Sequence, residues 1–152
     1  MDQGYNTDLA LWAEGQARAL RDAGHAGTNL PIDWENVAEA IEALGKSQGR
    51  ELASRLAVIL VHLMKLEASP AAEPRAGWQE TIARERGDIE RLLTDSPSLR
   101  PTVPSRIDTE LGKARRVAAL ALAGYGEASR VDLGGLCYTA EQVLEDWFPD
   151  GL

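Results

Sequence analysis

The sequence predicts an all-α fold, namely a single-domain helical bundle over residues 1–152 with about five main helices and a short C-terminal helix. Leu and Ala supply much of the 44% of residues that are hydrophobic, and both favour helices. Aromatic residues make up only 5%, so the residues that suit a pleated sheet are scarce. A chain of 152 residues is long enough for one domain with a hydrophobic core and short for two.

The first helix is predicted to begin at Asn6 or Thr7, with Asp8 in the first turn, where the helix dipole favours an acid. Gly24 is a suitable stop, because glycine readily adopts the left-handed conformation that ends many helices. Residues at helical spacing predict its packed face, which comprises Leu9, Trp12, Ala13, Gln16, Ala19 and Leu20.

The second helix is predicted over residues 34–44. Asp33 is its expected N-cap, and Ile32 is placed to pack against Val37 as a hydrophobic staple. Gly45 is predicted to end this helix, and Ser47 to cap the next one. Since the connecting turn is short, the two helices are expected to be antiparallel neighbours.

The third helix, about residues 48–68, is apolar nearly all round. Leu56 and Leu63 lie on one face, while Val61 and Met64 fill other sides. A helix that is hydrophobic on every side is normally buried. We therefore expect this helix at the centre of the bundle.

A fourth helix is predicted over about residues 75–94, after a segment with two prolines. Its apolar seam contains a single acid, Glu85. The residues of the seam are Trp78, Ile82, Glu85, Ile89 and Leu92. The proline-containing segment from Ser96 to Pro101 is expected to form a stiff corner.

The last part of the chain is predicted to hold one long and one short helix. Ser105 with Asp108 resembles a capping box that opens a helix running to about Ala123. Residues 125–138 are glycine-rich and expected to be irregular. Thr139 can open a short last helix, and Trp147 with its neighbour Phe148 is expected to pack the tail onto the body.

Charge and composition restrict the classes of partner. The net charge is −8 and no basic block is present, so attraction to phosphate backbones is weak and nucleic acid is not an expected partner. The most apolar segment, Leu56 to Leu66, is too short to cross a bilayer, and a membrane partner is not expected. The single cysteine, Cys137, is expected to be a small packed residue in a reducing compartment, which with the lack of a signal peptide predicts a cytoplasmic protein.

Polar residues at three places are not explained by a simple bundle. The first is an acidic stripe of Glu35, Glu39 and Glu42 on the second predicted helix. The second is a basic set of Arg55, His62 and Lys65 on the third, and the last is Glu85. If the second and third predicted helices are antiparallel neighbours, the acidic stripe can face the basic set. The resulting candidate polar cluster comprises Glu39, Glu42, His62, Lys65 and Glu85.

Two interpretations of this cluster remain open. One is a structural ion-pair network, because buried charges need partners. The other is a divalent-metal site formed by carboxylates and His62 between facing helices. The sequence lacks the Glu-x-x-His and His-x-x-x-His spacings of known bundle sites, and it predicts no cofactor.

Short motifs spread over nearly the whole chain resemble those of one bacterial family. They include Tyr5-x-x-Asp8-Leu9 with Trp12, Asp33-x-Glu35-Asn36-x-x-Glu39, Ile41-Glu42-x-Leu44-Gly45-Lys46-Ser47, Arg50-Glu51-Leu52, His62-Leu63-x-Lys65, Trp78-x-x-Thr81-Ile82 with Glu85-Arg86, and Ser96-Pro97-Ser98-Leu99. The family is known as domain of unknown function number 29. The resemblance implies an all-α fold and a bacterial source, and it implies no reaction.

This chain departs from the family pattern at a few positions. Ala40 stands where a second glutamate would be expected beside Glu39, and Leu66 stands where an aromatic residue is commoner. Gly134 and Gly135 replace a proline-containing stretch. If the paired acids had a catalytic role in the family, Ala40 would put that role in doubt for this chain.

No catalytic motif is present, and Trp147 with Phe148 in the tail could form a partner surface as an alternative to packing on the body. The sequence therefore favours a non-enzymatic protein-interaction module, with another protein or further copies of the chain as partner. The alternative is a small metal-dependent hydrolase or a metal-binding regulatory protein that uses Glu39, Glu42, His62 and Glu85. Whether the chain is an enzyme stays open at this point.

Overall fold

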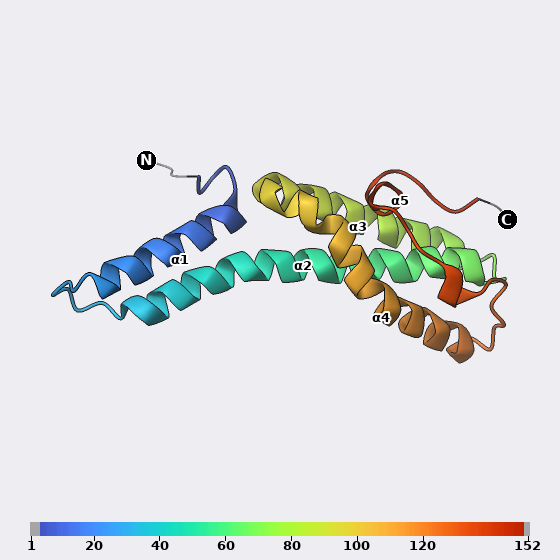
Figure 1. The fold of residues 1–152 in the computed structure, drawn as a ribbon. Coiled ribbons are helices and arrows are strands. Elements are labelled where there is room, and N and C mark those ends of the chain that lie inside the picture. The colour runs from blue at the N-terminus through green and yellow to red at the C-terminus, as the bar shows by residue number, and fades with distance from the viewer. Residues whose placement is uncertain (1–3, 151–152) are drawn as a thin grey trace. The chain divides into compact units, whose positions relative to one another are not determined.

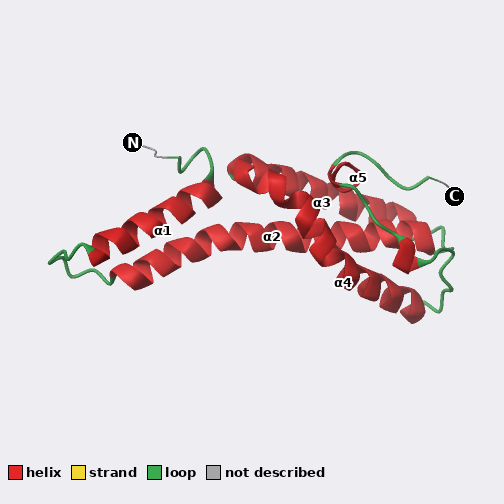
Figure 2. Ribbon diagram, viewed as in Figure 1, coloured by secondary structure: helices red, strands yellow, loops and turns green. Residues whose placement is uncertain are grey.

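A computed structural model describes residues 4–150, and every regular element in that range is a helix (Figures 1 and 2). The α-helices are α1 (Leu9–His25), α2 (Trp34–Ala68), α3 (Arg75–Asp95), α4 (Val103–Gly124) and α5 (Ala140–Leu144), and the 3-10 helices are η1 (Pro97–Thr102) and η2 (Leu133–Gly135). The predicted all-α bundle with a short C-terminal helix is confirmed. Within residues 4–150, no helix is both long and apolar enough to cross a membrane.

Contacts along the chain divide it into two compact units. The first contains residues up to Leu52 together with Arg91–Pro101, and the second contains Ala53–Glu90 and the residues from Thr102 onward. Helices α2 and α3 each contribute residues to both units. The single domain predicted for residues 1–152 stays a prediction.

The first unit is built on a hairpin of α1 and the N-terminal part of α2, which lie antiparallel (Figure 1). Its buried residues are small, for example Ala13, Ala17 and Ala38. Throughout the described chain, every large side chain that is fully buried lies at Leu52 or beyond. The hairpin therefore has little apolar core of its own.

Helix α1 begins and ends a few residues away from the predicted positions. Asp8, not Asn6 or Thr7, is the N-cap, and its carboxylate accepts a hydrogen bond of 2.9 Å from the Leu11 N–H. The helix continues past Gly24 to His25, and Gly27 beyond it has a φ of +80°. Gly27 is therefore the residue in the left-handed conformation. Gly24 has a different role, because its backbone approaches Trp34 too closely for a side chain.

The start of α2 follows the prediction. Asp33 precedes the helix, and its carboxylate accepts a hydrogen bond of 3.3 Å from the Asn36 N–H. The same carboxylate accepts a bond of 2.6 Å from the Asn36 amide. This local capping explains why the sequence pattern identified the boundary.

The predicted break at Gly45 is wrong, because α2 is one continuous helix of 35 residues from Trp34 to Ala68. Gly45 lies where α1 comes closest. A Cβ atom at Gly45 would stand 3.2 Å from both the Ala10 carbonyl oxygen and the Ala13 Cβ. Ser47 caps no helix, since its hydroxyl donates to the Leu44 carbonyl at 2.7 Å within the same helix.

The segment Arg91–Pro101 holds the start of α1 in the first unit. The Ser96 hydroxyl accepts a hydrogen bond of 3.1 Å from the Ala10 N–H. Ser98 donates to the Asp8 carboxylate from its backbone N–H at 2.6 Å and from its hydroxyl at 2.9 Å. The corner predicted from the prolines is η1, and it fixes the N-terminus of α1.

In the second unit, the C-terminal part of α2 supplies much of the core. Its residues Leu56, Ile59 and Leu63 have no exposed surface, as predicted for the apolar segment. Ile82 and Ile89 of α3 are buried as well. Helices α3 and α4 contribute most of the other large buried residues of this unit.

The capping box predicted at Ser105 is wrong, whereas the one at Thr139 is confirmed. Helix α4 begins earlier, at Val103, and the Ser105 hydroxyl donates to the Thr102 carbonyl at 3.2 Å. Proline in the first turn of α4 has no N–H to satisfy, which permits this earlier start. At α5, Thr139 and Gln142 make both bonds of the box.

Candidate functional site

The residues of the predicted polar cluster are distributed over both units. Glu39 and Glu42 belong to the first unit, while His62, Lys65 and Glu85 belong to the second. The turn that was expected to fold the acidic stripe against the basic set is absent, because α2 is continuous. Each part of the predicted cluster therefore has its own surroundings.

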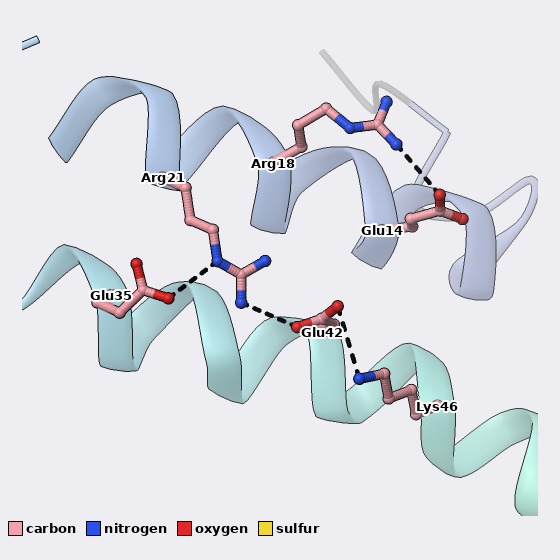
Figure 3. Close-up of polar contacts among 6 residues, drawn as sticks. All are labelled: Glu14, Arg18, Arg21, Glu35, Glu42 and Lys46. Carbon is pink, nitrogen blue, oxygen red and sulfur yellow. Dashed lines mark hydrogen bonds and ion pairs between the residues drawn. The ribbon is translucent and has the colours of Figure 1, made fainter. Parts of the chain in front are cut away.

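Arg21 of α1 is the partner of the acidic stripe (Figure 3). Its guanidinium donates to Glu35 at 3.0 Å and to Glu42 at 2.9 Å. Lys46 lies 3.6 Å from the second oxygen of Glu42. The Arg21 hydrogen bond, and then the Lys46 charge, lower the pKa of Glu42. Glu35, Glu42 and their partners thus form an ion-pair ladder across one flank of the hairpin.

The sequence pattern identifies the acidic residues of this ladder, whereas Arg21, the cation that pairs with them, was not among the predicted residues. The signal that could have found Arg21 is its position in the helix preceding Glu35, since a short loop places successive helices antiparallel. Glu39 lies exposed on α2. Within the first unit, the structure therefore favours the ion-pair interpretation of Glu42.

In the second unit, Arg55 carries an ion-pair network of its own. Its guanidinium lies 2.9 Å from carboxylate oxygens of both Glu85 and Asp88. The Glu85 side chain is only 14% exposed, and its hydrogen bond with the Arg55 guanidinium satisfies the carboxylate in this half-buried position. Arg55, a member of the basic set on this helix, is thus the direct partner of Glu85.

His62 follows on the same side of α2. A backbone carbonyl can only accept, so the His62 Nδ1 that lies 2.8 Å from the Val58 oxygen carries the hydrogen. The neutral ring then has a free lone pair on Nε2. Burial is the largest effect and lowers the pKa of His62. The hydrogen bond to the Val58 carbonyl opposes it, the charge of Lys65 lowers the pKa further, and Glu85 and Arg84 have smaller effects of opposite sign.

Lys65 lies one turn beyond His62 and has aromatic neighbours. Its ammonium nitrogen is 5.7 Å from the centre of the Trp78 ring and 5.8 Å from that of Tyr125. These distances are typical of cation–π contacts. His62, Lys65 and Glu85 therefore share the α2 side that faces α3, as a neutral base, a cation and a paired acid.

Metal-ligand chemistry requires several such side chains at one point. Within residues 4–150, no three His, Cys, Asp or Glu side chains lie close enough together to hold a metal ion. A shallow pocket of about 340 Å³ contains none of the predicted residues; Ala53, Thr102, Ser105, Arg106, Thr109 and Glu110 line it. The metal-dependent alternative stays a prediction.

Arg86 is a buried cation that the sequence analysis did not single out. It is 9% exposed and donates to the carbonyls of Gln142, Val143 and Trp147 at 2.7–2.9 Å. Its guanidinium carbon lies 5.0 Å from the centre of the Phe148 ring. Burial lowers the pKa of Arg86. The C-terminal segment is thus docked on α3, as predicted for Trp147 and Phe148.

Tyr138 and Cys137 flank this docked segment. The buried Tyr138 hydroxyl donates to the Glu67 carboxylate, and burial first, then that bond, raises its pKa. Trp147 packs edge-on against the Tyr138 ring. The expectation that Cys137 is packed is wrong, because its neighbour Tyr138 occupies the interior and Cys137 is exposed.

Opposite the ion-pair ladder, the middle of the flank of the α1–α2 hairpin carries no ionisable side chain, and Asp33 and Glu51 lie at its two ends. At about 100° per residue, the residues that point to this flank can be assigned on both helices from the Arg21 contacts. We call this surface the neutral face. It comprises Trp12, Gln16, Ala19, Leu20 and Ala23 of α1 with Val37, Ala40, Ile41, Leu44 and Gln48 of α2.

The bulky residues of the neutral face are incompletely covered. Val37 and Leu44 are 39% and 38% exposed, and Trp12, Leu20 and Ile41 are half-buried. Beneath them the two helices meet through alanine and glycine. Val37 and Leu44 are thus among the large apolar side chains that the first unit exposes, and both lie on this flank.

Fold and site together define an all-helical bundle protein with an ion-paired, half-exposed N-terminal hairpin. The model of the family described as domain of unknown function DUF29 matches residues 5–148, and the chain belongs to that family. It is similar to an α-helical protein of unknown function from Rhodospirillum rubrum ATCC 11170, with 28% identity over 95% of this chain and 91% of the other and a TM-score of 0.79. No curated protein matches the chain.

Proposed function

We propose that this chain is a non-enzymatic protein-interaction module whose contact surface is the neutral face of the α1–α2 hairpin. The observation that carries the proposal is the inverted arrangement of side chains in the hairpin. Small residues such as Ala13 and Ala38 are buried, whereas Val37 and Leu44 are more than a third exposed. A helical hairpin with this arrangement gains buried apolar area when another protein surface packs against its exposed Val and Leu side chains.

The energetics favour a covered neutral face. Complete burial of a Val or Leu side chain stabilises a protein by roughly 1.5–3 kcal/mol relative to exposure. The exposed parts of Val37 and Leu44 therefore leave on the order of 1 kcal/mol each ungained. Because the face lacks ionised groups, a partner would cover it without the desolvation cost of buried charge.

The test is a photo-crosslinking amino acid placed in the living cell at Leu44, with Glu39 as the matched control. Both positions are exposed on the same helix, but only Leu44 lies on the neutral face. We expect a defined protein adduct from position 44 and none from position 39. Equal adducts from both positions, or none from position 44, would contradict the proposed contact surface.

A further inference from the structure

We propose that the occupant of the neutral face is a second copy of this chain, so that two α1–α2 hairpins pack as a four-helix bundle. This inference rests on the proposed function and names its partner. A symmetric dimer uses the same surface on both copies, which must therefore be complementary to itself. Charge, shape and size of the neutral face each meet that condition.

Charge is the first condition. The chain carries a net charge of −8, so two copies repel each other over most of their surfaces. Arg21 pairs with Glu35 and Glu42 on the opposite flank, and Glu51 lies beyond the end of the neutral face. A surface without ions is the place where like-charged copies approach at the lowest electrostatic cost. A strongly charged partner would find no ion on this face to pair with.

Shape is the second condition. Small and bulky residues alternate on the neutral face, with Ala19 and Ala23 on α1 and Ala40 on α2 among larger residues such as Ile41 and Leu44. Such alternation lets the ridges of one helix pair enter the grooves of another. Two copies related by a twofold axis can therefore interlock large residues with small ones.

Size is the third condition. A helix of 17 residues, such as α1, is about 25 Å long, and two helices side by side are about 20 Å wide. The hairpin thus offers a footprint of about 500 Å², the same order as the roughly 800 Å² of accessible surface that each partner contributes to a stable interface. A second hairpin of equal length covers that footprint from end to end.

The experiment measures the molar mass of the purified full chain by size-exclusion chromatography with light scattering. Protein concentration is varied from about 1 µM to about 500 µM, where interfaces of this size associate. Leu44→Glu and Ala40→Glu place a charge on the neutral face, and Ala40→Glu removes no packed side chain. Ala43→Glu makes the same change on an exposed alanine outside that face. Circular dichroism melts establish that each variant is folded.

We expect a dimer whose Kd rises at least about tenfold in Leu44→Glu and Ala40→Glu, because each substitution buries an unpaired carboxylate of both copies in the interface. Ala43→Glu should leave the Kd unchanged. A wild-type chain that is monomeric at every concentration would overturn the inference, as would equal weakening by Ala43→Glu. A monomer that still gives a crosslinked adduct with a different protein from position 44 would leave the proposed function standing.

Discussion

Arg86 illustrates how one buried side chain can hold a whole segment. Three backbone carbonyls of residues 142–147 accept hydrogen bonds from its guanidinium, and Phe148 stacks on it. Lysine could not replace it, because only the planar guanidinium directs several donors to separate acceptors at once. The residue thus joins α3 to the C-terminal segment.

Arg86→Met should lower the free energy of unfolding by about 2–4 kcal/mol, because buried carbonyls lose their donors. Hydrogen exchange should accelerate in residues 139–150. Arg84→Met is the matched control, since Arg84 is exposed on the same helix. Urea denaturation gives the energies, and a variant as stable as the wild type would show that the tail docks without this contact.

His62 should make stability depend on pH. Its pKa is lowered in the folded state, so the unfolded chain binds the proton more readily. Stability is therefore complete above the unfolded-state pKa of about 6.5 and falls as the pH drops below it. His62→Gln should flatten this fall below about pH 6.5.

Chemical denaturation at a series of pH values measures the effect of His62. His25→Gln serves as the control, because His25 is exposed at the end of α1. If the wild type and His62→Gln lost stability in parallel over this window, the buried neutral imidazole would have no energetic role.

At the residue scale, the sequence pattern identified unusual acidic side chains but not all of the cations that pair with them. Glu42 and Glu85 were recognised as unusual, yet their partners Arg21 and Arg55 were assigned incompletely. A helical wheel gives the side of a helix on which a charge lies, but not the neighbouring helix that faces it. Arg86 appears in a family motif, but its role could not be predicted because its acceptors are backbone carbonyls, which carry no sequence signature.

At the scale of elements, local capping signals predicted helix starts correctly at Asp33 and Thr139 but not at Ser105. The caps at Asp33 and Thr139 involve residues three positions apart, so the sequence shows them directly. Gly45 was interpreted as a helix end, whereas it allows α1 to approach α2. Glycine serves both purposes, and only the packing of another helix distinguishes them.

Gly45→Ala should therefore destabilise the protein. Alanine normally stabilises a helix interior by up to about 1 kcal/mol relative to glycine. At Gly45 the added Cβ would meet Ala10 and Ala13 at 3.2 Å, which forces α1 and α2 apart. Gly112→Ala in α4 is the control, because nothing lies within 4 Å of its added Cβ.

Thermal melting of the two glycine variants shows whether each substitution raises or lowers the melting temperature. We expect a lower melting temperature for Gly45→Ala and an equal or higher one for Gly112→Ala. A rise in both variants would mean that α1 does not pack closely on Gly45.

At the scale of the whole molecule, composition and periodicity were sufficient for the all-α class. Long runs of helix formers and a fully apolar segment predict a helical bundle without any knowledge of contacts. The neutral face could not be predicted in this way, because it depends on which flank Arg21 occupies. The apolar residues on that face were assigned to a core, and in the structure they lie half-exposed.

The central claim is that association completes the α1–α2 hairpin through its neutral face. Hydrogen exchange of the full chain at low and high protein concentration tests it most directly, with α4 as the internal reference. We predict that amides in α1 and in residues 34–50 become more protected as concentration rises, while those of α4 change little. Protection of the hairpin that is independent of concentration would contradict the account.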